Sequence, residues 1–596
     1  MPEAGHLAMA VILGISSYLC DSAAALLVQG KLTSVVEEER FERVKHTKSF
    51  PVGAIRYCLD EQGLSLSDVD YFAIHFDPRL SIVGRIPFML RFFPQSLLHL
   101  RSKQGQAVLN MLRLRHEVAE RMGVSERSLK HCKFVYVNHH LSHACSTFLT
   151  SPFDEAAIMT LDGGGEIATS AFHRGIGRRV ETFWTHNAPD SLGFLYSTLT
   201  KYLGFKPECD EGKVMGLAPY GEPRYLREFE KLIQYDDQGT FRLDMSYFTF
   251  QFGGDRWYSP KLVALLGPPR APESELTQHA KDVAATLQHV LEQVAVRLAR
   301  RLHREFPSKN LCLAGGVALN SVMNGKIFEQ TPFENVFIMP AASDAGTSLG
   351  NVLYVHNMLL ERARCAPLDN AYWGPSFKDE EVLAALEAER ENVSWVRHPD
   401  PAAEAARLLS ENKILGWFQG RMEFGPRALG NRSILANPTH PDMKDIVNAR
   451  VKFREAFRPF APSATLERAH DYFEFSCETP YMLLVVPVRP GFRERLPAIT
   501  HVDGTARLQT VTEAQNPRYY RLIRELGKRT GIECVLNTSF NVRGQPIVNT
   551  PAEAVTCLLK TGLDHLIIHD FVVSKQSAPG SVRAEASVPQ VAAASA

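Results

Sequence analysis

Short apolar runs separated by turn-forming residues fill the first part of the chain. The run AVILGIS (10–16), the turn SYLCDS and the run AAALLVQG (23–30) together predict a β-hairpin. KLTSVVEEERFERVKH (31–46) predicts a strand that passes into a charged segment. AAIMTLDGGGEIATSAFH (156–173) predicts a second unit of strand, turn and strand. The opening pattern is therefore that of a sheet-forming domain.

Two later segments change from a strand-like run to a helical pattern. KNLCLAGGVALNSVMNGKIFE (309–329) and NVFIMPAASDAGTSLGNVLYVHNML (335–359) each read as a buried strand, a small-residue turn and a helix. Turns of this kind present main-chain N–H groups that donate hydrogen bonds to phosphate at close range. The ordered series favours two stacked α/β lobes with a nucleotide between them, similar to actin and the sugar kinases.

The pattern also predicts an insertion and a division into domains. Residues 78–130 are apolar and basic with helical spacing, which favours a helical insertion packed on a lobe over a helix on a membrane surface. A fresh set of strands and helices begins near FKDEEVLAALEAER (377–390). We expect an N-terminal domain over 1–360, a second α/β domain over 365–575 and a disordered tail over 576–596.

Bulk composition narrows the functional classes. The 596 residues exceed what one core usually supports, and 66 basic side chains balance 66 acidic ones. This balance gives no reason to expect binding to nucleic acid or to an acidic membrane. No apolar run is long enough to span a bilayer, and no export signal is recognised. The 10 cysteines form no Cys-x-x-Cys pair, which fits a reducing cytoplasm.

The stretch FVYVNHHLSHACSTFL (134–149) offers a metal site. His139 and His143 are four residues apart, so both imidazoles share one helix face and can reach one ion. The alternative is a polar helix start with surface histidines. Asp162 and Asp344 each follow an apolar strand, and the mixed nitrogen and oxygen set suits iron(II), manganese or zinc. His140 is out of phase, so a local hydrogen bond is expected for it.

Eight motifs then occur in a fixed order: HHLSHA, LDGGGE, DEGKVMGLAPYG, LCLAGGVALNSVMNGK, EFGPRALGNRSILANP, KFREAFRPFAPS, VDGTARLQTV and VLNTSFNVRGQPIV. Over residues 9–575 the chain resembles the O-carbamoyltransferases that modify antibiotics, nodulation factors and toxins. The resemblance implies an actin-like (ribonuclease H-like) N-terminal domain and an α/β C-terminal domain that makes carbamoyl-adenylate from carbamoyl phosphate and ATP with magnesium. It also implies transfer to a hydroxyl at an iron site held by His139, His143, Asp162 and Asp344.

Several residues suit the chemistry of carbamoyl-adenylate. Carbamate is a poor electrophile until adenylation provides a leaving group, and a cation then stabilises the charge that develops. Glycine turns let the main chain approach the adenylate, and neighbouring polar side chains suit its ribose and phosphate. The candidates are Gly163, Gly164, Gly315, Gly316, Glu211, Lys213 and Asn320.

The C-terminal motifs are rich in guanidinium groups, which match phosphate oxygens. A charge run usually marks only a solvated face, but these arginines lie beside Gly, Pro and Phe, a composition that favours half-buried turns. Matched motif by motif, the set for carbamoyl phosphate and ATP is Arg427, Lys452, Arg458, Arg507 and Ser539, with Asn537, Arg432 and Asn541 as second choices.

One position departs from the family pattern. Members commonly read His-Asp-Ser-Ala-Ala-Ala in the first turn, and that histidine is a candidate base for the acceptor hydroxyl. This chain has Cys20 there, and an ordinary thiol has a pKa near 8.5. The base is then Cys20, Asp21 or a metal-bound group, or the acceptor needs little help. The catalytic candidates are Cys20, Asp21 and His139.

The leading hypothesis is an ATP-dependent O-carbamoyltransferase that acts on a small-molecule natural product, with a homodimer allowed and no nucleic-acid or membrane partner expected. Threonylcarbamoyl transfer to tRNA is the nearest rival, although the neutral charge balance shows no sign of a tRNA-sized basic patch. Two further hypotheses are an actin-like or sugar-kinase-like ATPase and a non-catalytic binding protein on the same scaffold. The hydrogenase-maturation enzymes use related modules but carry Cys-x-x-Cys zinc sites.

Overall fold

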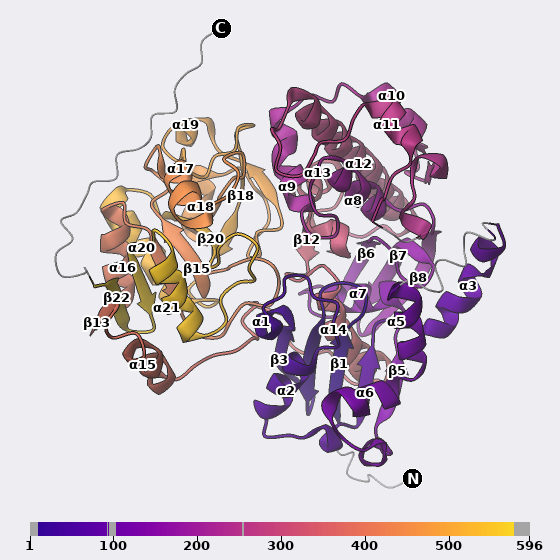
Figure 1. Ribbon diagram of the computed structural model, residues 1–596, viewed down its shortest axis with the longest axis horizontal. Helices are drawn as coiled ribbons and strands as arrows, with labels where there is room; N and C mark the ends of the chain where they lie inside the picture. The colour runs from indigo at the N-terminus through magenta and orange to yellow at the C-terminus, as the bar shows by residue number, and fades with distance from the viewer. Residues whose placement is uncertain (1–9, 92, 94–102, 253–254, 577–596) are drawn as a thin grey trace.

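The computed structural model describes residues 10–91, 93, 103–252 and 255–576. Almost all of the predicted tail, 577–596, lies outside these residues. The described part is α/β and contains two five-stranded sheets and one eight-stranded sheet. The N-terminal half forms two lobes and the C-terminal half lies beside both (Figure 1).

The first lobe is built on a sheet of order β3-β2-β1-β4-β5. Its first three strands are antiparallel neighbours, whereas β4 and β5 run parallel to β1. The predicted N-terminal hairpin is confirmed as β1 and β2, whose cores are buried. The strands are β1 (Val11–Ser16), β2 (Ala23–Val28), β3 (Lys31–Glu37), β4 (Tyr71–Ile74) and β5 (Lys133–Tyr136), with helices α1 (Glu39–Glu42) and α2 (Val52–Asp60).

The second lobe repeats this topology. Its sheet has the order β8-β7-β6-β11-β12, with an antiparallel meander followed by two strands parallel to β6. Two copies of this order define a ribonuclease H-like pair, so the expected two-lobed actin-like fold is confirmed. The strands are β6 (Glu155–Leu161), β7 (Ala168–Ile176), β8 (Arg179–Asn187), β11 (Asn310–Ala314) and β12 (Asn335–Ile338).

Two helices cross between the lobes. α7 (His139–Phe148) follows the last strand of the first sheet and packs on β6 and β11 of the second. α14 (Ala345–Leu353) follows β12 and packs on β1 and β2 of the first. The two helices also contact each other, and Gly350 permits the approach because a Cβ there would lie 1.9 Å from the carbonyl oxygen of Ser142. Both crossing helices therefore begin near the junction of the lobes.

Helices cover the second lobe and extend the first. The long amphipathic α12 (Gln278–Glu305) buries one face against the second lobe. The other helices of the second lobe are α8 (Leu192–Tyr202), α9 (Glu211–Leu217), α10 (Leu226–Leu232), α11 (Pro260–Leu266) and α13 (Ser321–Gln330). A small antiparallel pair is formed by β9 (Ile233–Tyr235) and β10 (Phe241–Leu243). The predicted insertion between β4 and β5 is helical, with α3 (Pro78–Arg91), α5 (Lys103–Leu112) and α6 (Leu114–Met122).

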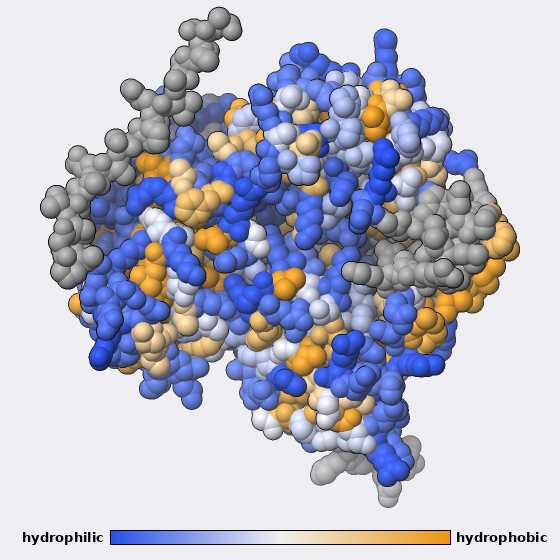
Figure 2. All heavy atoms as spheres, viewed as in Figure 1, coloured by the Kyte–Doolittle hydropathy of each residue, from blue (hydrophilic) through white to orange (hydrophobic). Residues whose placement is uncertain are grey.

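Helix α3 leaves several large apolar side chains in solvent. Leu80, Val83 and Leu90 are 49%, 67% and 74% exposed. Figure 2 shows this hydrophobic patch at the edge of the molecule where Figure 1 places α3. Within the described residues, no helix combines the length and the apolar character needed to cross a bilayer.

The C-terminal half is built on a mixed sheet of order β13-β22-β21-β14-β15-β20-β16-β19. Helices α16 and α20 pack together and bury Trp417, while α21 packs on β14 and β21 and contacts α15. The strands are β13 (Val393–Arg397), β14 (Leu415–Phe418), β15 (Arg432–Ala436), β16 (Ala461–Thr465), β19 (Gln509–Val511), β20 (Cys534–Ser539), β21 (His565–Ile568) and β22 (Phe571–Lys575), with a separate β17 (Val485–Pro487) and β18 (Thr505–Arg507) pair. The helices are α15 (Asp379–Glu387), α16 (Pro401–Ser410), α17 (Met443–Val447), α18 (Leu466–Tyr472), α19 (Pro490–Arg493), α20 (Pro517–Thr530) and α21 (Pro551–Lys560).

Buried polar contacts join the two halves. Arg40 of the first lobe donates to the carbonyl of Gly425 at 2.8 Å, and the Gly425 N–H donates to Glu37 at 2.7 Å. On the second lobe, Asn324 donates to the carbonyl of Leu483 at 2.9 Å. The C-terminal half thus contacts both lobes. The division at 360–365 stays a prediction.

Candidate functional site

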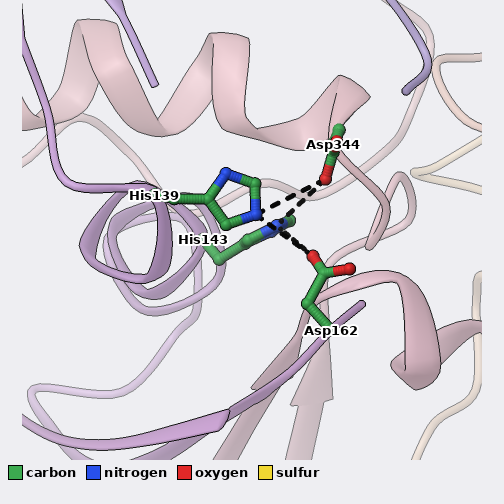
Figure 3. Close-up of side chains that lie close together, drawn as sticks. All are labelled: His139, His143, Asp162 and Asp344. Carbon is green, nitrogen blue, oxygen red and sulfur yellow. Dashed lines mark hydrogen bonds and ion pairs between the residues drawn. The ribbon is translucent and has the colours of Figure 1, made fainter. Parts of the chain in front are cut away.

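Four side chains from three distant segments meet where the lobes join (Figure 3). His143 Nε2 lies 2.8 Å from Asp162 Oδ2 and 3.5 Å from Asp344 Oδ1. His139 Nε2 lies 3.3 Å and 3.6 Å from the same two oxygens. One nitrogen or oxygen atom from each residue lies within 4.8 Å of the others. The two histidines and two aspartates singled out in the sequence therefore form one cluster.

The elements explain why these side chains converge. His139 and His143 are one turn apart on α7, and Asp162 follows directly on β6. Asp344 is the N-cap residue of α14. Parallel strands and crossing helices thus deliver all four groups to one junction of the fold.

The start of α7 is held in place by a buried carboxylate. The side chain of Asn138 caps the helix by accepting from the Leu141 N–H. Glu166 accepts from the His139 N–H at 3.2 Å and from Asn138 Nδ2 at 2.8 Å, and it also accepts from the Asp77 N–H. These contacts hold the main chain at the first histidine in place.

Burial and opposite charge set the electrostatics of the cluster. Burial lowers the pKa of His139, but the hydrogen bond to Asp162 and the charges of Asp344 and Asp162 outweigh it and raise this pKa to about 9. Burial raises the pKa of Asp162, yet both histidines hold it well below its usual range. Burial and the charge of Asp162 raise the pKa of Asp344. The two carboxylates repel each other, and a bound cation would remove that repulsion.

The donor set fits a divalent ion. Atoms at about 2.1 Å from one metal lie roughly 3.0–3.5 Å from each other, and the four pairs above span 2.8–3.6 Å. Both histidines turn Nε2 toward the two carboxylates, so all four ligand atoms point to one place. Two imidazoles with two carboxylates suit iron(II), manganese or zinc.

Glycine turns enclose the cluster. Gly163 and Gly164 follow Asp162, and Gly316 would place a Cβ 3.3 Å from Asp162 Oδ1. Gly315 has φ +94°, and a Cβ there would lie 2.1 Å from the Leu161 carbonyl oxygen. Larger residues would therefore clash with the strand that ends at Asp162.

The other nucleotide candidates of the N-terminal half are not part of this cluster. Asn320 caps α13, and its amide exchanges two hydrogen bonds with Gln288. Its polar atoms are thus already engaged by the protein. Glu211 accepts from Ser197, whereas Lys213 pairs with Asp210 at 3.0 Å on the side that faces the C-terminal half.

The C-terminal half gathers cations at its face toward the second lobe. Arg427 Nη2 lies 3.4 Å from the Leu319 carbonyl oxygen. Burial, together with the charge of Arg458, lowers the pKa of Arg427 to about 10. Burial and three neighbouring arginines lower the pKa of Arg507 well below its usual range. Neither Arg427 nor Arg507 has an ion-pair partner among the residues described. Such an excess of buried positive charge is typical of a site for anions.

Lys452 and Ser539 extend the same region. Lys452 is buried and its Nζ donates to the Ser539 carbonyl at 2.7 Å and to Asn541 Oδ1 at 2.7 Å. Ser539 donates to the same Asn541 oxygen at 2.8 Å. Asn537 lies deeper and donates to Ala428, Ser463 and Gln509. Lys452 and Ser539 are therefore adjacent, whereas Asn537 supports the strands.

Arg432, a second choice from the sequence, does not join this cluster. Its guanidinium is fully buried, donates to the carbonyls of Gln419, Gly420, Asn431 and Pro375, and lies over the Phe418 ring. A phosphate would have to displace these bonds. Main-chain carbonyls therefore already engage Arg432, and its role as a ligand stays a prediction.

Arg454 was not among the ligand candidates and does lie with the cations. Burial and the charge of Arg458 lower its pKa to about 9, and it stacks over Phe460. The motif KFREAFRPF contains it, but spacing alone does not distinguish it from the neighbouring basic residues.

Family models match both halves of the chain. Residues 11–353 match the model described as carbamoyltransferase N-terminus, and residues 406–575 match carbamoyltransferase C-terminus. The chain belongs to the carbamoyltransferase family. The resemblance recognised from the eight motifs is thereby confirmed, and the chain is a carbamoyltransferase rather than a kinase-like ATPase or a binding protein.

Relatives of this carbamoyltransferase include proteins named for nodulation. It is 42% identical over 605 residues to the uncharacterized protein sll1178 of Synechocystis, covering 96% of this chain and 98% of that protein. It is 40% identical to nodulation protein NolNO of Sinorhizobium fredii over 94% of this chain and 80% of the relative. Nodulation protein U of Rhizobium tropici is 29% identical over 93% of this chain and 95% of the relative.

Solved structures match this chain only distantly. HypF from T. kodakarensis covers 59% of this carbamoyltransferase, which covers 48% of that chain, at 15% identity and a TM-score of 0.29. A ROK hexokinase from Thermus thermophilus covers 58% of this chain and 99% of its own at 13% identity and a TM-score of 0.27. The fold assignment therefore rests on the repeated strand order.

Proposed function

We propose that this carbamoyltransferase makes carbamoyl-adenylate from carbamoyl phosphate and magnesium ATP in its C-terminal half, and transfers the carbamoyl group to a hydroxyl at the His/Asp cluster. The observation that carries the proposal is the group of buried cations facing the second lobe. Burial and mutual repulsion lower the pKa of Arg427, Arg454 and Arg507, and a bound phosphate would relieve both effects. The two phosphorylated substrates, carbamoyl phosphate and ATP, would supply the negative charge that these cations lack.

Further contacts of the C-terminal half fit this role. Lys452 is desolvated, and Arg454 is the first of the charges that lower its pKa after burial. Its main-chain and side-chain partners at 539 and 541 hold the ammonium in one position. Arginine forks suit bidentate contact with phosphate, and Lys452 adds a point charge.

The His/Asp cluster suits the transfer step. We assign His139, His143, Asp162 and Asp344 as ligands of one divalent ion, with iron(II) the preferred candidate. When bound, such an ion acts as a Lewis acid toward the phosphate and carbamoyl oxygens of the donor. Glu166 anchors the main chain at the start of α7, and the glycine turns let the adenylate approach.

The acceptor is proposed to be a small-molecule natural product. Two of the relatives above are named nodulation proteins, and the hydroxylated products of such tailoring pathways are the class implied by the resemblance. A cytoplasmic enzyme, a homodimer and the absence of nucleic-acid and membrane partners stay predictions. Threonylcarbamoyl-type transfer to tRNA is the other outcome of the transfer assay.

The test separates the two half-reactions. The wild-type protein should exchange labelled pyrophosphate into ATP only when carbamoyl phosphate is present. Arg507→Ala should lose this exchange, whereas Arg524→Ala, which changes an exposed arginine of α20, should retain it. Asp162→Asn should keep exchange but lose carbamoyl transfer to a panel of hydroxylated compounds, followed by mass. Exchange that is absent from the wild-type protein, or unchanged in Arg507→Ala, would refute the proposal.

A further inference from the structure

A histidine–carboxylate pair lies beside the metal cluster. His46 Nδ1 is 2.6 Å from Asp21 Oδ1, and the side chains are 18% and 15% exposed. Asp21 belongs to the turn between β1 and β2, while His46 comes from the segment after α1. Unlike the buried histidines of α7, this imidazole is partly exposed.

The main chain around the pair is held in an unusual conformation. Tyr18, Asp21 and His46 have φ values of 73°, 44° and 55°, in the left-handed region that non-glycine residues seldom adopt. Hydrogen bonds run from the Tyr18 N–H to Lys48 and from the Ser22 N–H to Thr47. The His46 N–H donates to Glu39 at 2.9 Å. Both members of the pair and the nearby Tyr18 thus have strained main-chain conformations, which indicates a functional constraint.

The pair is linked to the metal cluster through Ser343. Asp21 is hydrogen-bonded by Ser343, the residue before Asp344. The negative charge of Asp344 raises the pKa of the neighbouring Cys20. The pair thus lies at the edge of the proposed transfer site rather than on a remote surface.

Cys20 itself is unsuited to remove a proton. Burial raises the pKa of its thiol well above the usual range, and the carboxylates of Asp21 and Asp344 raise it further. A thiolate would be rare at neutral pH. The group that accepts the proton has to come from elsewhere in this turn.

We propose that His46, oriented by Asp21, is the general base for the acceptor hydroxyl; this inference rests on the proposed function. Asp21 accepts from Nδ1–H, which places the lone pair of the neutral ring on Nε2. Nε2 takes the hydroxyl proton while the hydroxyl oxygen bonds to the carbamoyl carbon. The bond from that carbon to the adenylate oxygen breaks, AMP leaves with the electron pair, and the products are the carbamate ester, AMP and a proton on His46.

Neighbouring groups give the step a pH dependence. The ring contacts Asp21 and the Cys209 thiol, and the charged groups nearby are Glu39, Lys45, Lys48 and Glu208. Burial lowers the pKa of His46, but the charge and hydrogen bond of Asp21 outweigh it and raise this pKa well above its usual range. Neutral imidazole therefore forms as the pH rises, and transfer should accelerate with it.

The experiment compares His46→Gln with His116→Gln, which removes an exposed histidine paired with Glu126 at 2.7 Å. The probe is the sugar or amino sugar of a panel that gains the most carbamoyl mass with wild-type protein. If no panel member reacts, AMP release to water in the presence of iron(II) is measured instead. Pyrophosphate exchange and melting temperature are recorded for every variant.

His46→Gln should lose transfer by roughly 10²–10⁴-fold while exchange, melting temperature and His116→Gln remain at wild-type values. His46→Ala should regain part of its transfer when imidazole is added. Asp21→Asn should shift the rising limb of the pH profile to lower pH, and Cys20→Ala should lose less than tenfold.

Full transfer by His46→Gln with intact exchange would overturn the role of His46 alone. So would a loss in Cys20→Ala as large as in His46→Gln, or the absence of imidazole rescue. Absence of exchange from wild-type protein would instead refute the proposed function and the base assignment that rests on it.

Discussion

Gly350→Ala should disable metal binding from outside the ligand set. A Cβ at this position would lie 1.9 Å from the Ser142 carbonyl oxygen, whereas such contacts are essentially never shorter than 3.0 Å. The clash is between two backbones, so α14 and α7 must separate by at least about 1.1 Å. Asp344 begins one helix and His143 lies beside Ser142 on the other. Because metal–ligand distances tolerate shifts of only about 0.2 Å, the ligand set would open.

The separation also breaks contacts that now join the helices. Ser142 Oγ donates to the Thr347 carbonyl at 2.9 Å and to Asn351 Oδ1 at 2.8 Å. Overpacking of this kind costs about 1–3 kcal/mol of stability. We expect the protein to fold with a lower melting temperature and to bind iron(II) roughly 10- to 100-fold more weakly, the loss typical when groups that position metal ligands are changed.

The assay is anaerobic titration with iron(II), followed by calorimetry, on Gly350→Ala and on a matched control. Gly491→Ala is that control because it also lies in a helix and no atom lies within 4 Å of the added Cβ. Circular dichroism establishes that both variants are folded. Iron affinity in Gly350→Ala equal to that of the control would refute the claim that α7 and α14 position the ligands.

Three other changes test separate parts of the structure. Asp344→Asn should weaken metal binding about 10- to 100-fold in the same titration, with no loss of pyrophosphate exchange. Arg40→Ala should destabilise the protein by about 3–5 kcal/mol in denaturant unfolding, because the 1%-exposed guanidinium bonds Glu37 and the Gly425 carbonyl between the halves. The raised pKa of His46 means that its pairing with Asp21 stabilises the fold fully below its unfolded pKa of about 6.5. The melting-temperature advantage over Asp21→Asn should thus fade as the pH rises through the folded pKa of His46.

Local patterns of apolar and small residues predict much of the fold. The hairpin at β1 and β2 and the strand-to-helix units at β11 and β12 follow from apolar runs that end at small residues. The proximity of His139 and Asp162 could also be predicted from the sequence. In this topology, residues at the ends of neighbouring strands and on the adjoining helix lie close together. Sequence alone does not reveal the exchange of α7 and α14 between the two sheets, which depends on packing at Gly350.

Long-range pairs set the limit of such reasoning. His46 follows Asp21 by 25 positions without a motif that joins them, and their contact requires the main-chain bonds between the two segments. Arg432 and Arg507 show the same limit for arginines. Both lie in polar motifs with glycine nearby, yet main-chain carbonyls surround one guanidinium while other cations surround the second. Whether a buried arginine already has its acceptors is a property of the assembled structure, and that property decides which arginine is free to bind a phosphate.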